Sequence, residues 1–220
     1  MPALITWWTM DVRDVAPHAP NEDVVSRAGA DLLARWNEPA RHYHTTRHLV
    51  EMFGALEELE DAGEIDDRGC AIARLAAWFH DAIHDPHLRS GSNEADSAAL
   101  ARDTLPLLAV GEDDVETIDR LIRLTVRHDT DTAERLDATF HDADLWILSA
   151  PQERFDSYCD QVREEYAHIP EAAYRQGRVA ILGPLFHRDT IYRTSRALRG
   201  WETVARINLG RELARLRVDT

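Results

Sequence analysis

Hydrophobic residues recur at helical spacing along most of this 220-residue chain. Residues 21–36 begin with Asn21, a residue type that caps helices, and carry paired valines and leucines seven and eight positions apart. Residues 45–62 place their large apolar side chains on one side, and Gly63 follows at the point where such a helix would end. The pattern predicts two amphipathic helices in these segments.

The next segment, residues 66–83, is apolar almost all round. Alanine, isoleucine, leucine, tryptophan and phenylalanine occupy every face, a composition typical of a helix buried inside a protein. Pro86 follows shortly after, and the residue before a proline disfavours helical backbone. Residues 66–83 are therefore predicted to form a buried helix that ends before Pro86.

Six further segments have helical spacing: residues 93–105, 113–127, 143–149, 151–167, 171–186 and 195–217. Asp142 is expected to cap the helix over residues 143–149. No segment alternates apolar and polar residues as a half-buried strand does. The sequence thus predicts an all-α fold, a single-domain multi-helix bundle of about nine helices. This domain is expected over residues 21–220, and residues 1–20 are expected to be an N-terminal extension.

Composition and charge narrow the classes of function. The net charge of −15 disfavours binding to duplex nucleic acid, because the surface repels phosphates. The chain has no run of about 18 apolar residues, so no membrane span is predicted. The first residues do not resemble a secretory leader. Cys70 and Cys159 fit no zinc or redox spacing, so a reducing cytoplasm is the expected compartment.

The chain contains no lysine, so all 25 of its basic residues are arginines. This excludes functions that need a lysine amine, such as Schiff-base formation, pyridoxal phosphate attachment and the phosphate-binding loop of nucleotide hydrolases. Any phosphate must therefore be bound by arginine, by a metal ion or by backbone amides.

Three separated segments carry candidate metal ligands. His80 and Asp81 are adjacent near the end of the buried helix, where both side chains can reach one ion over the helix edge. His44 and His48 are four residues apart and would share one helix face. The third segment, residues 142–145, contains two aspartates. Each segment also has a simpler interpretation: a solvent-exposed helix end, a surface or capping histidine, and carboxylates that cap a helix.

Taken together, the segments resemble the HD-domain superfamily of metal-dependent phosphohydrolases, and most closely its small, single-domain bacterial members. The resemblance rests on YHTTRH at residues 43–48, FHDAIHDP at 79–86, NEADSA at 93–98, TVRH at 125–128 and DADL at 142–145. It continues through VREEY, GRVAIL, IYRT and ARINL to the end of the chain, but it does not include residues 1–20. An HD-type helical domain is expected from this resemblance.

The resemblance implies that His48, His80, Asp81 and Asp144 hold one divalent cation. His48 is preferred to His44, and Asp144 to Asp142, by their positions in the motifs; Asp142 is left as a cap or as a residue behind the ligands. Nitrogen and oxygen ligands without thiolate suit manganese, iron, nickel, magnesium or zinc, and the sequence does not choose among them.

Other residues are candidates for roles beside the cation. Glu94 could orient or deprotonate a water molecule, and His128 could protonate the leaving oxygen or bind phosphate. Glu94 also stands at a helix start, where a carboxylate is favoured without any catalytic role. His84 is interpreted as a residue of the pocket wall. The candidate substrate contacts are His44, Arg47, Arg163 and Arg178, although most arginines in such a chain form salt bridges.

The expected function is hydrolysis of a small phosphorylated substrate, a nucleotide or another phosphomonoester or pyrophosphate, by a metal-activated water. One alternative is a di-metal HD protein, either a di-iron oxygenase or a phosphodiesterase. Such relatives carry two further helical histidines between the His-Asp pair and the last aspartate, and only His128 meets that condition. A second alternative is a non-catalytic sensor or scaffold that keeps the metal. No feature predicts an oligomeric state.

Overall fold

All regular structure that the computed structural model describes is helical, and it describes residues 2–88, 91–126 and 134–217. The predicted all-α class is therefore confirmed for these residues. Within them the chain forms α1 (Pro2–Val15), α2 (Glu22–Trp36), α3 (Thr46–Asp61), α4 (Asp67–His80), α5 (Ser92–Thr104), the 3₁₀ helix η1 (Leu105–Leu108), α6 (Glu112–Leu124), α7 (Arg135–Asp144), the 3₁₀ helix η2 (Leu145–Ser149), α8 (Gln152–Glu165), α9 (Glu171–His187), α10 (Ser195–Gly200) and α11 (Glu202–Arg217).

The described residues contain eleven α-helices, where the sequence predicted about nine helices in all. One difference is α1, which lies in the segment expected to be an extension. Its Trp8 and Val12 are fully buried, and Trp8 packs edge-on against Trp78 of α4 at 5.5 Å between ring centroids. The Trp8 indole also donates a 2.7 Å hydrogen bond to the carbonyl of Val25 in α2. The first helix is thus part of the hydrophobic core.

The second difference lies at the C-terminal end of the chain, where one predicted helix is two. The segment predicted as 195–217 is divided after Gly200 into α10 and α11. Trp201, at the junction, is buried and donates from its indole to Glu58 of α3. Burial of this large ring against another helix stabilises the fold and offsets the helical hydrogen bonds that are lost where the segment is divided.

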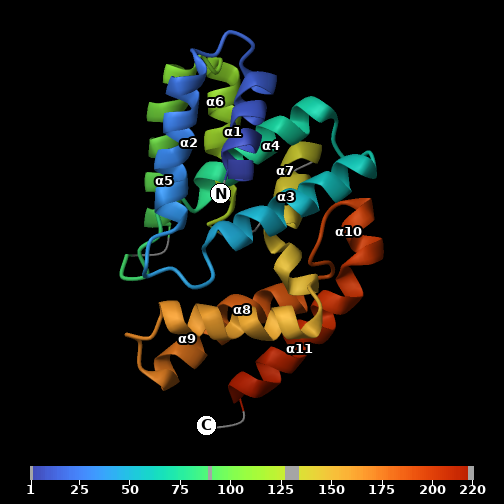
Figure 1. Ribbon diagram of the computed structural model, residues 1–220. Coiled ribbons are helices and arrows are strands. Elements are labelled where there is room, and N and C mark those ends of the chain that lie inside the picture. The colour runs from blue at the N-terminus through green and yellow to red at the C-terminus, as the bar shows by residue number, and fades with distance from the viewer. Residues whose placement is uncertain (1, 89–90, 127–133, 218–220) are drawn as a thin grey trace.

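Helix α4 lies at the centre of the N-terminal group of helices, among α1, α3, α5 and α6 (Figure 1). Every residue from Cys70 to His80 except Arg74 is buried, as predicted for a helix that is apolar all round. The helix ends at His80, three residues earlier than predicted. Consequently Asp81 is the C-terminal cap of α4, directly after the helical residue His80.

The prediction that Asp142 caps a helix over residues 143–149 is wrong. Asp142 lies in the last turn of α7, which begins at Arg135, and η2 follows α7 directly. Only two large apolar side chains, Leu136 and Phe140, lie in α7, which is too few to show helical spacing in the sequence. The consequence for the site is that Asp142 and Asp144 belong to a helix end.

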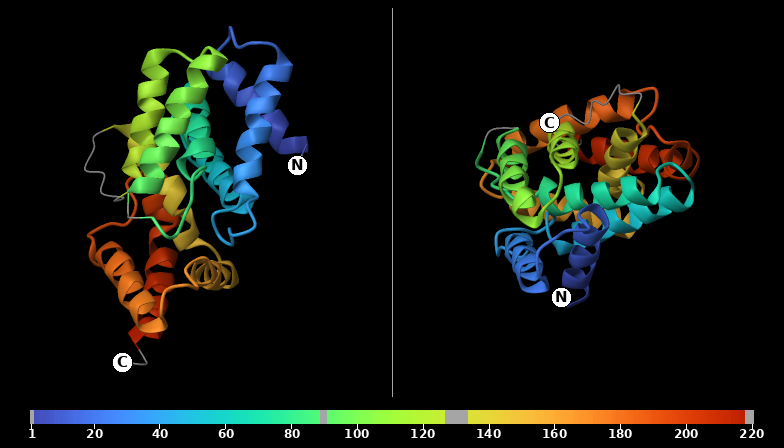
Figure 2. Two further views of the ribbon diagram at one scale, coloured as in Figure 1. Left: turned by 90° about the vertical axis from the view of Figure 1, so that its left-hand side faces the viewer. Right: turned by 90° about the horizontal axis from the view of Figure 1, so that it is seen from above.

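The C-terminal helices α8, α9 and α11 form a second group, which lies below the N-terminal group in Figure 1 and also in the left view of Figure 2. Helices α3 and α7 lie where the two groups meet. Arg154 of α8 joins the groups by two hydrogen bonds to Glu51 of α3, at 2.6 and 2.7 Å. No helix in the described part of the chain is long and apolar enough to cross a membrane.

Candidate metal centre

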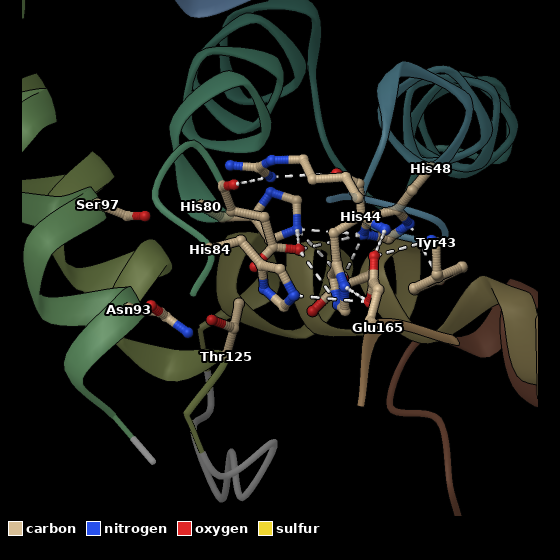
Figure 3. Close-up of polar contacts among 12 residues, drawn as sticks. Tyr43, His44, His48, His80, His84, Asn93, Ser97, Thr125 and Glu165 are labelled. Carbon is tan, nitrogen blue, oxygen red and sulfur yellow. Dashed lines mark hydrogen bonds and ion pairs between the residues drawn. The ribbon is translucent and has the colours of Figure 1, made fainter. Parts of the chain in front are cut away.

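The four side chains that the sequence singled out as ligands converge at the junction of the two helix groups. The Nε2 atoms of His48 and His80 are 3.2 Å apart. Asp81 Oδ2 lies 3.0 Å from Nε2 of His80 and 3.7 Å from that of His48. Asp144 Oδ1 lies 3.3 Å from Nε2 of His48 and 3.5 Å from that of His80. Figure 3 shows the two imidazoles facing each other.

These separations match those of ligands around one ion. Atoms bound to a cation at about 2.1 Å lie about 3.0–3.4 Å apart in octahedral or tetrahedral geometry. Three of the five distances, between 3.0 and 3.3 Å, fall in that range, and the other two are close to it. His48, His80 and Asp81 therefore form a group that could hold an ion, and Asp144 presents a further oxygen beside both imidazoles.

Both imidazoles are held with Nε2 toward the common point. Nδ1 of His80 donates to the carbonyl of Ala77 at 2.8 Å, so the neutral ring presents the lone pair of Nε2. Nδ1 of His48 is hydrogen-bonded to the Tyr43 hydroxyl at 3.1 Å. A histidine that binds a metal usually has its second ring nitrogen fixed in this way. The arrangement behind the ligands thus also fits a metal site.

The electrostatics of the centre favour a positive charge at the same point. Burial by itself lowers the pKa of His80, but Asp81 and Asp144 outweigh it and hold that pKa well above its usual value. Burial likewise raises the pKa of Asp81, and the neighbouring imidazoles of His80, His44 and His48 more than offset it, so the pKa is lowered. The ionised carboxylate of Asp81 in this buried cluster would be stabilised by a cation.

Asp142 and Asp144 face opposite ways, because residues two positions apart on a helix are about 200° apart around its axis. The Asp144 carboxylate points toward His48 and His80. The Asp142 carboxylate is fully buried on the other side and accepts hydrogen bonds from the amides of Arg193 and Thr194. Asp142 therefore anchors the loop before α10, a role that the sequence did not reveal.

Arg41 holds together the two segments that supply the histidines, and the sequence analysis did not identify it. Its buried guanidinium donates to the carbonyls of Asp81 and Ala82 at the end of α4, at 2.7 and 2.9 Å. It also donates to the carbonyl of His44 at 3.1 Å. The two carbonyls that directly follow α4 are thereby satisfied, and the loop before α3 is fixed beside them.

Glu165, at the end of α8, was also not identified from the sequence, although it lies within the VREEY segment. Its buried carboxylate accepts from the backbone amides of residues 42, 43 and 44 and from Nδ1 of His44 at 2.6 Å. Burial raises the pKa of Glu165, but His44 and these hydrogen bonds outweigh it and lower the pKa. Glu165 therefore remains ionised and fixes the orientation of His44 (Figure 3).

A cavity of about 190 Å³ opens onto the candidate ligands, with His48, Asp81 and Asp144 in its lining. A larger cavity of about 520 Å³ adjoins it. The two cavities share the lining residues Tyr43, His44, Glu94, Thr125, Tyr158, Arg178 and Ile181. A small molecule in the larger cavity would thus reach the centre.

Three of the other predicted site residues line both cavities: His44, Glu94 and Arg178. Glu94 lies in the first turn of α5, and burial, together with the charge of Asp81, raises the pKa of its carboxyl group. Arg178 of α9 is buried and donates to the Tyr158 hydroxyl at 2.8 Å, while its Nε has no hydrogen-bond partner. Each is thus placed to contact a molecule in the cavities.

The remaining predicted site residues are placed differently. Arg47 is exposed and pairs with Glu51, and Arg163 pairs with Glu171; neither arginine lines the two cavities. His84, predicted to belong to the pocket wall, lies behind His44 and stacks on it, outside the lining of these cavities. His128 lies outside the described residues.

Comparison of the chain with protein-family models found no match, and comparison with curated proteins found no similar sequence. The function is therefore inferred from the ligand atoms, the cavities and the charges of this site.

Proposed function

We propose that this protein is a metal-dependent phosphohydrolase that cleaves a small phosphorylated substrate with a water molecule. The observation that carries the proposal is the convergence of His48, His80, Asp81 and Asp144 at a cavity, at separations that suit one cation. The resemblance to the HD-domain superfamily supports it, since that family binds its metal with the same order of residues. An HD-type helical domain is part of this proposal.

The ligand set determines which ions are expected. Two imidazole nitrogens and two carboxylate oxygens suit manganese, iron, nickel, magnesium or zinc, and the absence of thiolate disfavours softer ions. When bound, a divalent cation lowers the pKa of a coordinated water and polarises a phosphoryl group.

Arg178 is proposed to bind the phosphoryl group of the substrate. Its guanidinium is buried at the cavity wall, and one hydrogen bond to Tyr158 leaves Nε unpartnered. A buried guanidinium with unused donors binds an anion with little competition from water. Because the chain has no lysine, an arginine is the expected cation for this role.

Glu94 is proposed to accept a proton from the attacking water. The carboxyl group lines both cavities, and burial raises its pKa, which makes it a stronger base than an exposed glutamate. The first turn of α5 also stabilises a negative charge on Glu94. A carboxylate that is favoured at a helix start can therefore also act as the proton acceptor.

The size of the cavities indicates the size of the substrate. Volumes of about 190 and 520 Å³ are in the range of pockets that enclose small molecules. Together with the net charge of −15, this favours a small phosphate ester over a nucleic acid duplex.

Metal content and hydrolysis can be measured on the same preparations. Wild-type protein is expected to retain a divalent ion through gel filtration and to hydrolyse at least one member of a panel of phosphomonoesters, nucleotides and pyrophosphates. Asp81→Ala is expected to lose both the ion and the activity. Asp160→Ala, which removes an exposed aspartate of α8, is the matched control and is expected to retain both.

Two results would contradict the proposal in different ways. Asp81→Ala with wild-type metal occupancy would show that the ligands are wrongly assigned. Wild-type protein that binds metal but hydrolyses nothing in the panel with any of the five ions would favour a non-catalytic metal-binding sensor or scaffold.

A further inference from the structure

We propose a second cation site beside the first, formed by His44, His84 and Asp81. Each of these residues offers one ligand atom, and the three atoms lie within 4.8 Å of one another. Asp81 would belong to both sites, so this inference rests on the proposed metal centre and extends it. Figure 3 shows His44 and His84 beside each other, next to His48 and His80.

His44 is held in the orientation that a metal ligand needs. Glu165 binds Nδ1 of His44 at 2.6 Å and therefore keeps the ring proton on that nitrogen. The opposite nitrogen, Nε2, faces Asp81 with 3.9 Å between it and Oδ2. A carboxylate that fixes one ring nitrogen while the other binds a metal is a recurrent arrangement in metal sites. The structure therefore favours metal ligation by His44 over the substrate contact predicted from the sequence.

His84 supplies the independent observation. Its side chain is only 6% exposed, and its Nε2 is buried without a hydrogen-bond partner. The nearest carboxylate oxygen, Oε2 of Glu165, is 3.5 Å away, and the ring stacks on His44 with 3.9 Å between centroids. A buried polar group without a partner is unfavourable, and a cation bound at the edges of the two stacked rings, beside Asp81, would supply a partner for His84.

The charges around the second site also suit a cation. Asp81 Oδ2 lies within 4 Å of Nε2 of His80, His48 and His44, so one carboxylate faces both groups of histidines. Glu165 adds a second ionised carboxylate on the far side of His44 and His84. A carboxylate shared between two ions, about 3.5–4 Å apart, is typical of two-metal hydrolytic centres.

The second site does not use the histidines that di-metal relatives of this superfamily are expected to carry between the His-Asp pair and the last aspartate. His44 precedes the pair in the sequence, and His84 lies in the loop just after α4. In hydrolysis, the second ion would bind a phosphoryl oxygen at the cavity wall, since His44 and Asp81 both line the smaller cavity.

The test is the number of Mn²⁺ ions bound per chain, measured by isothermal titration of metal-free full-length protein and by elemental analysis. Wild-type protein is expected to bind two ions and to give the electron paramagnetic resonance signal of exchange-coupled Mn²⁺. His84→Phe is expected to bind one ion and to lose the coupling. His87→Phe, which alters an exposed histidine three residues away, is the matched control and is expected to bind two.

Two further variants keep the test decisive if His84→Phe does not fold. His84→Gln retains a polar side chain of similar length and is expected to weaken the second binding step at least tenfold. Glu165→Gln keeps hydrogen-bonding capacity beside His44 and is expected to weaken the same step about 10–100-fold, as loss of a partner behind a metal ligand does.

The outcomes separate the second site from the first. One ion per chain in both wild-type protein and His84→Gln would overturn the second site and leave the proposed function intact. Two ions bound with unchanged affinity by His84→Gln would overturn the assignment of His84. No bound Mn²⁺ in folded wild-type protein would overturn both sites.

Discussion

Asp142 and Asp144 show how two identical side chains acquire different roles within one turn of a helix. Asp144 faces the imidazoles of His48 and His80, whereas Asp142 is fully buried and accepts hydrogen bonds from the loop before α10. Both are aspartates in the same short motif, so only their direction from the helix axis distinguishes them.

Replacement of these two aspartates is expected to give opposite results. Asp142→Ala leaves the amides of Arg193 and Thr194 without their acceptor and is expected to lower the free energy of unfolding by about 3 kcal/mol. Asp144→Ala is expected to lose bound metal with a smaller loss of stability. Urea denaturation and metal analysis of both variants check this, and each variant is the control for the other. Metal loss confined to Asp142→Ala would reverse the assignment.

Another titratable residue, Asp11 of α1, lies outside the proposed metal centre. Its carboxylate is buried and accepts from Arg74 at 2.7 Å and from the Trp78 indole at 3.3 Å. Burial raises the pKa of Asp11 from its ordinary value of 3.8 to about 6, against the opposing effect of Arg74. The folded state therefore holds a proton on this group more tightly than the unfolded chain does.

The contribution of Asp11 to stability is expected to depend on pH in a defined direction. Between pH 4 and 6 the folded state binds more protons than the unfolded state, so stability from this group falls as the pH rises and is constant above that range. Relative to Asp11→Asn, wild-type protein is expected to lose about 2 kcal/mol of unfolding free energy from pH 4 to pH 7. Urea denaturation at several pH values measures this difference. A difference that does not change with pH would contradict the assigned pKa.

At the scale of elements, the approach of α1 to α2 depends on one glycine. A Cβ added to Gly29 of α2 would lie 2.4 Å from Cδ1 of Trp8, which is closer than any real contact of this kind. Trp8 is fully buried and tied to Val25, so its ring has little room to move. Because Gly29 has no side chain, α1 and α2 can pack closely at this point.

Gly29→Ala is therefore expected to destabilise the protein by about 1–3 kcal/mol through overpacking, despite the better helix propensity of alanine. Gly54→Ala in α3 is the matched control, because a Cβ there meets nothing within 4 Å. That control is expected to be neutral or to stabilise by up to about 1 kcal/mol. Thermal denaturation of the two variants tests the contact, and equal stabilities would show that α1 does not pack as described.

At the scale of the whole molecule, the proposed metal centre lies where the two groups of helices meet. Helices α3, α4 and α7 would supply its ligands, and α8 supplies Glu165, which holds the loop that precedes α3. A cation at this junction would therefore be bound by the folded arrangement and not by the unfolded chain. Metal binding and folding are linked whenever this condition holds.

Removal of metal is consequently expected to lower the stability of the entire protein. At a metal concentration about 100 times the dissociation constant, one ion contributes about 2.7 kcal/mol to the free energy of unfolding. Wild-type protein should show this decrease when a chelator is added, while Asp81→Ala should have the same stability with and without the chelator. A wild-type denaturation curve that metal does not affect would contradict a cation held between the helix groups.

The helical content of the chain was predictable because it depends on local spacing. The apolar positions of residues 66–83 repeat on every face, so the burial of α4 follows from its composition alone. The caps at Asn21 and Asp66, whose side chains accept amide hydrogen bonds, likewise depend on neighbours within four residues. By contrast, the role of α1 was not predictable, since the burial of Trp8 requires partners from α2 and α4.

The sequence by itself determined that the chain is helical, that it lacks lysine chemistry, and that His48, His80, Asp81 and Asp144 are candidate ligands. These properties depend on residue types and on distances along the chain. Only the tertiary structure decided that the four side chains converge, that Asp142 faces away, and that Arg41 and Glu165 hold the surrounding loops. These decisions join residues up to 123 positions apart, and such contacts form only when helices pack.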